Sequence, residues 1–267
     1  MRNFNPICLI TTIIFLSALC SCKKVIDVNL KNAATQMVIT GEVNNRPGPY
    51  QVTITKTVNF TSDNNFPAVS GALVIITGNG VTDTLTENTP GNYLTHALKG
   101  KPGNSYALNV LIEGHSYTAT SVMPQPVRLD SIDFMLGREN NIFPVAYFKD
   151  PTGVPNYYQF IEYENGKKLS NGRGNSVFDD RLSDGRYISR LLYNDSTDLK
   201  SGDTLIVQMN CVDKPVYDYL NQLLQITGGG GRGFSSPTPA NPTTNITGGV
   251  LGYFSANTVT GKEALVP

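Results

Sequence analysis

The chain has 267 residues with 21 basic and 21 acidic side chains, so its formal net charge is zero at neutral pH. A protein that binds nucleic acid through phosphate contacts presents a basic face, and the balanced charge argues against that class of function. The length is enough for two ordinary domains.

The first 22 residues have the features of an export signal. Arg2 is the only charged residue before Lys23, and a largely apolar run covers residues 7–16. This run is shorter than the about 20 apolar residues that cross a bilayer, which favours a secretory signal over a membrane-spanning helix. Leu19-Cys20-Ser21-Cys22 resembles a lipobox, in which the last cysteine is acylated through its sulfur. We therefore predict a signal peptide over residues 1–21, lipidation of Cys22, and a tether over residues 22–36. The alternative is an uncleaved signal anchor.

Removal of the signal leaves two cysteines, Cys22 and Cys211. If Cys22 is acylated, Cys211 has no disulfide partner, so the exported chain is not a disulfide scaffold. Cys211 follows the apolar segment 205–209, and we interpret it as a small buried hydrophobic residue.

From residue 37 on, apolar and polar residues alternate over short segments that are bounded by turn residues. Residues 38–43 and 50–56 alternate with a period of two and flank the turn cluster 44–49, which predicts a hairpin. Short strands at such spacing are typical of a β-sandwich, which we predict over residues 37–124. The further strand segments expected in this part lie at residues 72–77, 82–86, 90–94, 106–112 and 115–120.

Met123-Pro124-Gln125-Pro126 marks a predicted boundary, because two prolines near a strand end stiffen the chain. We predict a second antiparallel β-rich domain over residues 127–267. Its expected strands lie at residues 130–134, 145–148, 157–163, 187–193 and 203–209.

One amphipathic helix is predicted near residues 214–226. Asp213 is a suitable N-cap, and Pro215 lies in the first turn. Gly228 begins a segment rich in Gly, Ser and Pro that we predict to be mobile over residues 228–244. Apolar residues at helical spacing form the face that we expect to be buried: Val216, Tyr219, Leu220, Leu223 and Leu224.

Three segments resemble the strand entries of transthyretin-like and carboxypeptidase-regulatory-like sandwiches. They are Ala72-Leu73-Val74, Pro90-Gly91-Asn92-Tyr93 and the segment 103–110. The resemblance covers residues 38–123 and implies an Ig/transthyretin-like fold for the first domain.

The whole layout resembles the exported bacterial lipoproteins that are catalogued as domain of unknown function 4249. The resemblance implies a lipoprotein at the outer membrane, beside a TonB-dependent transporter of the nutrient-uptake type. No activity is assigned to the family, so no catalytic residue or cofactor is carried over. Besides the lipobox and the first sandwich, the matching segments are Tyr157-Tyr158-Gln159-Phe160, Asp218-Tyr219-Leu220, residues 241–246 and Gly252-Tyr253-Phe254-Ser255-Ala256.

Residue patterns for catalysis or metal binding are sparse. His96 and His115 are the only histidines, and neither lies in a His-x-x-x-His or Cys-x-x-Cys context. No Gly-x-Ser-x-Gly nucleophile elbow occurs. Asp179, Asp180 and Asp184 form the one local acidic cluster and are candidate calcium ligands, because calcium takes carboxylate oxygens. Their spacing does not match an Asp-x-Asp-x-Asp-Gly loop, and a solvated acidic loop is the alternative.

Tyr157, Tyr158 and Tyr163 lie on one predicted strand and alternate between its two faces. Some of these rings are therefore expected to point outward, where aromatic side chains stack on sugars or form protein interfaces. They are the candidate contact residues for a partner or ligand. The alternative is the ordinary enrichment of tyrosine in β-strands.

These features together predict a non-enzymatic binding or assembly module that is anchored to the outer membrane by its N-terminal lipid, needs no cofactor, and is accessory to a TonB-dependent barrel. One alternative is a structural envelope lipoprotein without a small ligand. Another is a hydrolase whose site is assembled from residues distant in the sequence. No residue selects between the periplasmic and the cell-surface face.

Overall fold

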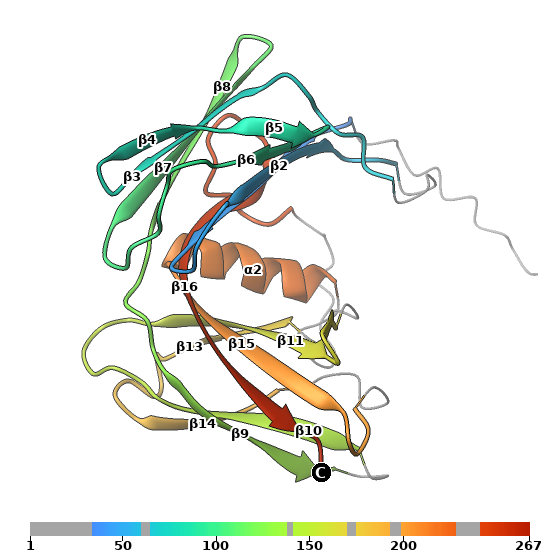
Figure 1. Cartoon of the computed structure of the whole chain (residues 1–267), viewed down its shortest axis with the longest axis vertical. Helices are drawn as coiled ribbons and strands as arrows, with labels where there is room; N and C mark the ends of the chain where they lie inside the picture. Colours follow the sequence, from blue (N-terminus) through green and yellow to red (C-terminus); the bar gives the residue numbers. More distant parts are fainter. Residues whose placement is uncertain (1–33, 60–64, 138–140, 170–174, 193–198, 228–240) are drawn as a thin grey trace, which may run out of the picture. The chain divides into compact units, whose positions relative to one another are not determined.

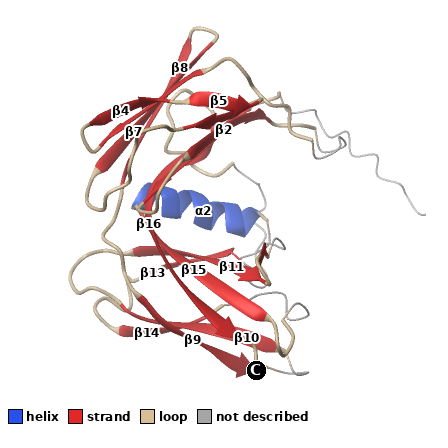
Figure 2. Cartoon of the chain, in the orientation of Figure 1, coloured by secondary structure: helices blue, strands red, loops and turns tan. Residues whose placement is uncertain are grey.

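The computed structural model describes residues 34–59, 65–137, 141–169, 175–192, 199–227 and 241–267. Cys22 and most of the segment 228–244, which was predicted to be mobile, lie outside the described residues. Residues Thr35–Pro267 form one compact unit. This unit is mainly β with one helix among its described residues, which confirms the predicted fold class (Figure 2).

The strands before residue 123 form the two sheets around the first hydrophobic core. Strands β1, β2, β6 and β5 are neighbours in one sheet, and β4, β3, β7 and β8 form the other (Figure 1). β1 and β2 pair antiparallel, as the predicted hairpin requires. The bounds are β1 (Met37–Asn44), β2 (Gln51–Lys56), β3 (Leu73–Gly78), β4 (Val81–Thr84), β5 (Thr86–Thr89), β6 (Asn92–Leu94), β7 (Ser105–Ile112) and β8 (His115–Val122).

Alternation of side chains explains why these strands pack as two layers. In β7, every second residue from Tyr106 to Ile112 is buried and the residues between them are exposed, as successive residues of a strand point to opposite faces. Leu85 lies between β4 and β5 and is buried in the same core. The chain changes from one sheet to the other at this residue, so the single strand predicted over residues 82–86 is two strands.

A second core lies between a three-stranded sheet, β14-β10-β9, and part of the larger sheet. Phe148, Tyr158 and Phe160 are fully buried in it, and the rings of Phe148 and Tyr158 are 4.9 Å apart. The strands are β9 (Leu129–Leu136), β10 (Ile142–Lys149), β11 (Tyr157–Glu164), β12 (Lys167–Lys168), β13 (Asn175–Asp179), β14 (Tyr187–Leu191) and β15 (Thr204–Val212).

The C-terminal strand β16 (Leu251–Leu265) takes part in both cores. Its first half pairs parallel with β1, from Val38↔Leu251 to Asn44↔Asn257, and its second half pairs antiparallel with β15. One hydrogen-bonded path, β12-β11-β15-β16-β1-β2-β6-β5, therefore runs through both parts of the described chain.

The sequence prediction assigned the C-terminal segment to the second domain alone. The pairing of β16 with strands of both parts corrects this assignment. Ile246, Val250, Phe254 and Ala256 are buried in the first core, although the sequence prediction placed them in the domain 127–267. The prediction followed the order of the chain, whereas β16 returns to pair with the first strand. Before the C-terminal segment is reached, the proline-containing segment near residue 124 does separate the two cores: residues that precede it belong to the first core and residues that follow it to the second.

The helix α2 (Lys214–Ile226) has the predicted bounds and packs on the outer face of the larger sheet. Asp213 caps it through a hydrogen bond from the Val216 backbone N–H, 3.3 Å long. The other carboxylate oxygen of Asp213 accepts the Ser121 hydroxyl at 2.7 Å, which joins the helix start to β8. Of the predicted buried face, Val216, Tyr219, Leu220 and Leu224 are buried and Leu223 is half-buried.

Candidate functional site

Two turns of the second part bring acidic residues together. One turn connects β10 to β11 over residues 150–156, and the other connects β13 to β14 over residues 180–186. The Asp150 backbone N–H donates to the Arg186 carbonyl at 3.0 Å, and the Asp180 N–H donates to the Asn156 carbonyl at 3.3 Å. These bonds hold the two turns side by side.

The carboxylates of Asp150, Asp180 and Asp184 lie at the meeting point of the two turns, with one oxygen of each within 4.8 Å of the others. We call these three residues the acidic cluster. Asp150 and Asp180 are buried, with 1% and 4% of their surface exposed, and Asp184 is exposed.

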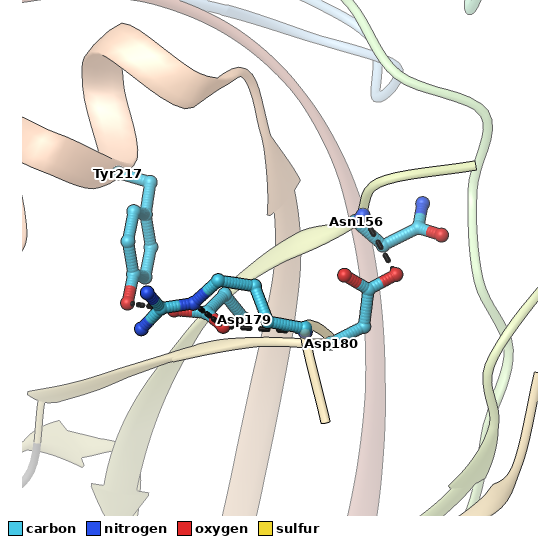
Figure 3. Close-up of polar contacts among 5 residues, drawn as sticks. Asn156, Asp179, Asp180 and Tyr217 are labelled. Carbon is cyan, nitrogen blue, oxygen red and sulfur yellow. Dashed lines mark hydrogen bonds and ion pairs between the residues drawn. The ribbon is translucent and has the colours of Figure 1, made fainter. Parts of the chain in front are cut away.

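Most oxygens of the acidic cluster already accept hydrogen bonds from the protein. Asp150 accepts the Tyr158 hydroxyl on one oxygen and the Gly185 N–H, at 2.9 Å, on the other. Asp180 accepts the Asn156 N–H at 2.9 Å, and Asp184 accepts the Gly153 N–H at 2.8 Å. The acidic cluster therefore connects the two turns, and the Asp180–Asn156 bond is visible in Figure 3.

Burial raises the pKa of Asp180, and the neighbouring carboxylates of Asp150 and Asp184 raise it further, against the Asn156 N–H that lowers it. The pKa of the Tyr158 hydroxyl is also raised, by burial and by its bond to Asp150. A cation at the cluster would favour the charged carboxylates. Calcium takes six to eight oxygens, and four of the cluster's six carboxylate oxygens already accept hydrogen bonds.

Asp179, which the sequence grouped with Asp180 and Asp184, points elsewhere. It accepts the Tyr217 hydroxyl at 2.6 Å and the Arg181 guanidinium at 2.7 Å (Figure 3). Burial alone would raise the pKa of Asp179, but the hydrogen bonds from Arg181 and Tyr217 lower it. The predicted calcium trio is corrected: Asp150 replaces Asp179, because adjacent residues of an extended chain point to opposite faces.

The predicted tyrosine contacts divide between the core and the helix interface. Tyr158 is fully buried, so it is not available to a partner, which corrects its assignment as a contact residue. Tyr157 is half-buried, and its ring lies 5.0 Å from that of Tyr217 on α2. Tyr163 is half-buried near the end of β11.

The other residues that could take part in chemistry are His96, His115 and Cys211, and they lie on separate elements of the fold. His96 is exposed and its Nε2 lies 2.7 Å from the Thr86 hydroxyl, while His115 is exposed at the start of β8. Cys211 is buried as predicted, and burial raises the pKa of its thiol. Within the described ranges, the acidic cluster is the only group of three or more His, Cys, Asp or Glu side chains close enough to share an ion.

Two shallow hollows are present on the described surface. One, of about 270 Å³, is lined by residues of the β5–β6 turn with Ser70, and the other, of about 260 Å³, lies beside α2 at Lys214 and Thr243. Neither includes the acidic cluster. No helix in the described part of the chain is both long enough and apolar enough to cross a membrane.

The family model described as "Domain of unknown function (DUF4249)" matches residues 23–263. No curated protein matches the chain.

Proposed function

The chain belongs to the DUF4249 family, and we propose that it is a lipoprotein, anchored to the outer membrane through Cys22, that acts as a non-enzymatic binding or assembly module. We further propose that its partner is a TonB-dependent barrel. The anchor is supported by the lipobox Leu19-Cys20-Ser21-Cys22, and the family match begins at residue 23, directly after the cysteine to be acylated.

The observation that carries the binding role is that the acidic groups of the fold serve its structure. The buried Asp150 and Asp180 and the half-buried Asp213 accept hydrogen bonds that join turns and elements of the fold. General acid–base catalysis needs such groups to face a substrate. His96, in the bend after β6 and beside a threonine, and His115, at the start of β8, are both exposed. The two hollows described above are each smaller than the roughly 300 Å³ at which small-molecule sites begin.

The lipid anchor is tested by acyl labelling. Cys22→Ala removes the sulfur that accepts the diacylglycerol, so we expect loss of palmitate incorporation and accumulation of the uncleaved precursor. Cys20→Ala is the matched control, because it leaves a small residue at its lipobox position and is expected to label as the wild type does. Labelling of Cys22→Ala at the wild-type level would rule out this anchor.

The partner is tested by affinity capture of the full chain from membranes that are solubilised in a mild detergent. We expect an outer-membrane barrel to co-purify with the wild type and not with Cys22→Ala, because the anchor brings both proteins to one surface and raises the local concentration. Capture of no barrel favours the structural envelope protein. Turnover of a glycan or peptide that is lost in Asp180→Asn would instead favour a hydrolase.

A further inference from the structure

The outward side of the sheet β4-β3-β7-β8 has no charged side chain. Asp83 is the only Asp, Glu, Lys or Arg in these four strands, and it faces the first core with 4% of its surface exposed. We call the outward side the uncharged face. Its residues are Leu73, Ile75 and Thr77 of β3; Thr82 and Thr84 of β4; Ser105, Ala107, Asn109 and Leu111 of β7; and Ser116, Thr118, Thr120 and Val122 of β8.

Three apolar members of the uncharged face are neighbours. Leu73 lies opposite Leu111 in the antiparallel pairing of β3 and β7, and Ile75 lies opposite Asn109. Leu73 and Leu111 are 46% and 43% exposed. Leu73, Ile75 and Leu111 therefore form one aliphatic cluster at one end of the pair β3–β7, with threonine, serine and asparagine around it. Val122, which is 49% exposed, lies apart from this cluster, opposite Ser105.

A surface of this kind restricts what can cover it. Interface centres are depleted of charged residues, and burying a charge without a partner is costly. The chain carries 42 Asp, Glu, Lys and Arg side chains among 267 residues, yet none of the thirteen positions of the uncharged face has one. A partner without unpaired charges at the contact therefore fits this face best.

We propose that the uncharged face is a self-association surface, and that its occupant is the same face of a second copy of this chain. The second copy offers the same absence of charge and the same sheet geometry. Two sheets that pack face to face align within about 30°, and a two-fold axis places the same residues on both sides of the contact.

The size of the uncharged face predicts a weak dimer. The four strands have 6, 4, 8 and 8 residues, and at about 3.3 Å per residue and about 4.8 Å between strands they cover roughly 410 Å². Two copies would bury on the order of 800 Å², at the low end of interface sizes, where weak and transient contacts lie. We therefore expect a dissociation constant in the micromolar range. Molecules that are held at one surface have a high local concentration, which would allow such a dimer to form.

Sedimentation equilibrium of the purified full chain, in a mild detergent with micelles in large excess, tests the proposal. Asn109→Asp adds a charge at the centre of the uncharged face with little change of shape, and we expect it to weaken dimerisation at least about tenfold. Asn88→Asp, at an exposed position of β5 outside the face, is the matched control and should leave the dissociation constant unchanged. The measurement does not depend on the lipid anchor, because detergent solubilises the N-terminal segment with or without acylation.

Mixing variants tests whether the occupant is a second copy. Asn109→Asp and Asn109→Lys should each be monomeric, and their mixture should regain dimers because opposite charges then meet across the contact. Unchanged thermal melting of both variants confirms that they fold. A wild-type chain that stays monomeric up to about 100 µM, far above the expected range, would overturn the proposal. So would equal weakening by Asn88→Asp, or a mixture that remains monomeric.

Discussion

In the first core, one oxygen of the buried Asp83 carboxylate accepts the backbone N–H groups of His96, Ala97 and Leu98 at 2.7–2.9 Å. In the second core, the buried Glu162 is 1% exposed, and neither of its carboxylate oxygens has a hydrogen-bond partner among the residues that the structure describes. Both side chains point inward from a strand of a β-sheet. They differ in the hydrogen-bond donors that neighbouring segments of the chain supply to the buried carboxylate.

The difference appears in the pKa values. Burial would raise the pKa of Asp83, but the three backbone donors, with a smaller contribution from His96, lower it. Burial raises the pKa of Glu162 to about 8. At neutral pH, Asp83 is therefore ionised and Glu162 is largely protonated. The turn after β6 stabilises a charge in the first core, whereas the strand that carries Glu162 has its own N–H groups committed to the sheet.

Glu162→Gln should have the largest effect. The folded pKa of about 8 lies above the usual value of 4.5 for a glutamate, so the folded state binds the extra proton. The contribution of Glu162 to stability should be greatest below pH 4.5 and fall by about 1.4 kcal/mol for each pH unit up to about 8. The amide does not ionise, so the variant should lack this slope and be several kcal/mol more stable than the wild type near pH 8. Urea unfolding between pH 5 and pH 8.5 measures the free energy of unfolding of both proteins.

The control for Glu162 is Glu263→Gln, an exposed carboxylate on β16. It should leave the slope of stability against pH unchanged. If Glu162→Gln and the wild type have parallel profiles, the buried glutamate has an ionic partner after all and the contrast with Asp83 fails.

Leu220→Ala tests whether the two cores unfold together. Leu220 is 3% exposed where α2 packs on the larger sheet, so its truncation should cost about 2–5 kcal/mol. Because β16 and Asp213 join both parts, we expect one unfolding transition at a lower midpoint by circular dichroism. Gln225→Ala on the exposed side of the helix is the control and should change stability little. Two separate transitions would show that the cores are independent.

Asp83→Asn should have the smallest of the three effects. It removes the charge that the three N–H groups stabilise, and hydrogen bonds to charged groups contribute about 1.5–3 kcal/mol. The folded pKa is lowered, so the contribution of Asp83 is present above the usual aspartate pKa of 3.8 and is lost as the pH falls through the folded pKa. The variant's deficit should therefore shrink in acid, opposite in direction to the Glu162 effect. Asp133→Asn, at an exposed position, should show no such dependence.

Local patterns predicted much of the fold because they reflect side-chain alternation and capping. The alternation in residues 106–112 predicted β7, and Asp213 with Pro215 predicted the helix start that the structure has. β13 was missed because Asn175–Asp179 has no clear alternation, and it is held as a strand by pairing with β11. Likewise, the polar end of β16 is a strand because β15 pairs with it.

The candidate site was less predictable because its members are distant in sequence. Asp180 and Asp184 were visible as a local cluster, but Asp150 joins them from a turn about 30 residues earlier. The motif Asp150-Pro151-Thr152-Gly153 marks a turn and carries no information about what the turn contacts. The burial of Tyr158 depends on which face of β11 meets the second core, and alternation alone does not say which face that is.

The pairing of β16 also constrains the order in which the molecule can fold. Val38 is paired with Leu251, so the outer edge of β1 stays open until the last strand of the described chain arrives. A chain that emerges N-terminus first cannot complete its first core as an early unit, because Phe254 and Ala256 belong to that core. Such long-range pairing slows folding and leaves strand edges exposed to aggregation. A chain of this design keeps an unpaired strand edge and an incomplete first core until residues 251–257 are available to pair with β1.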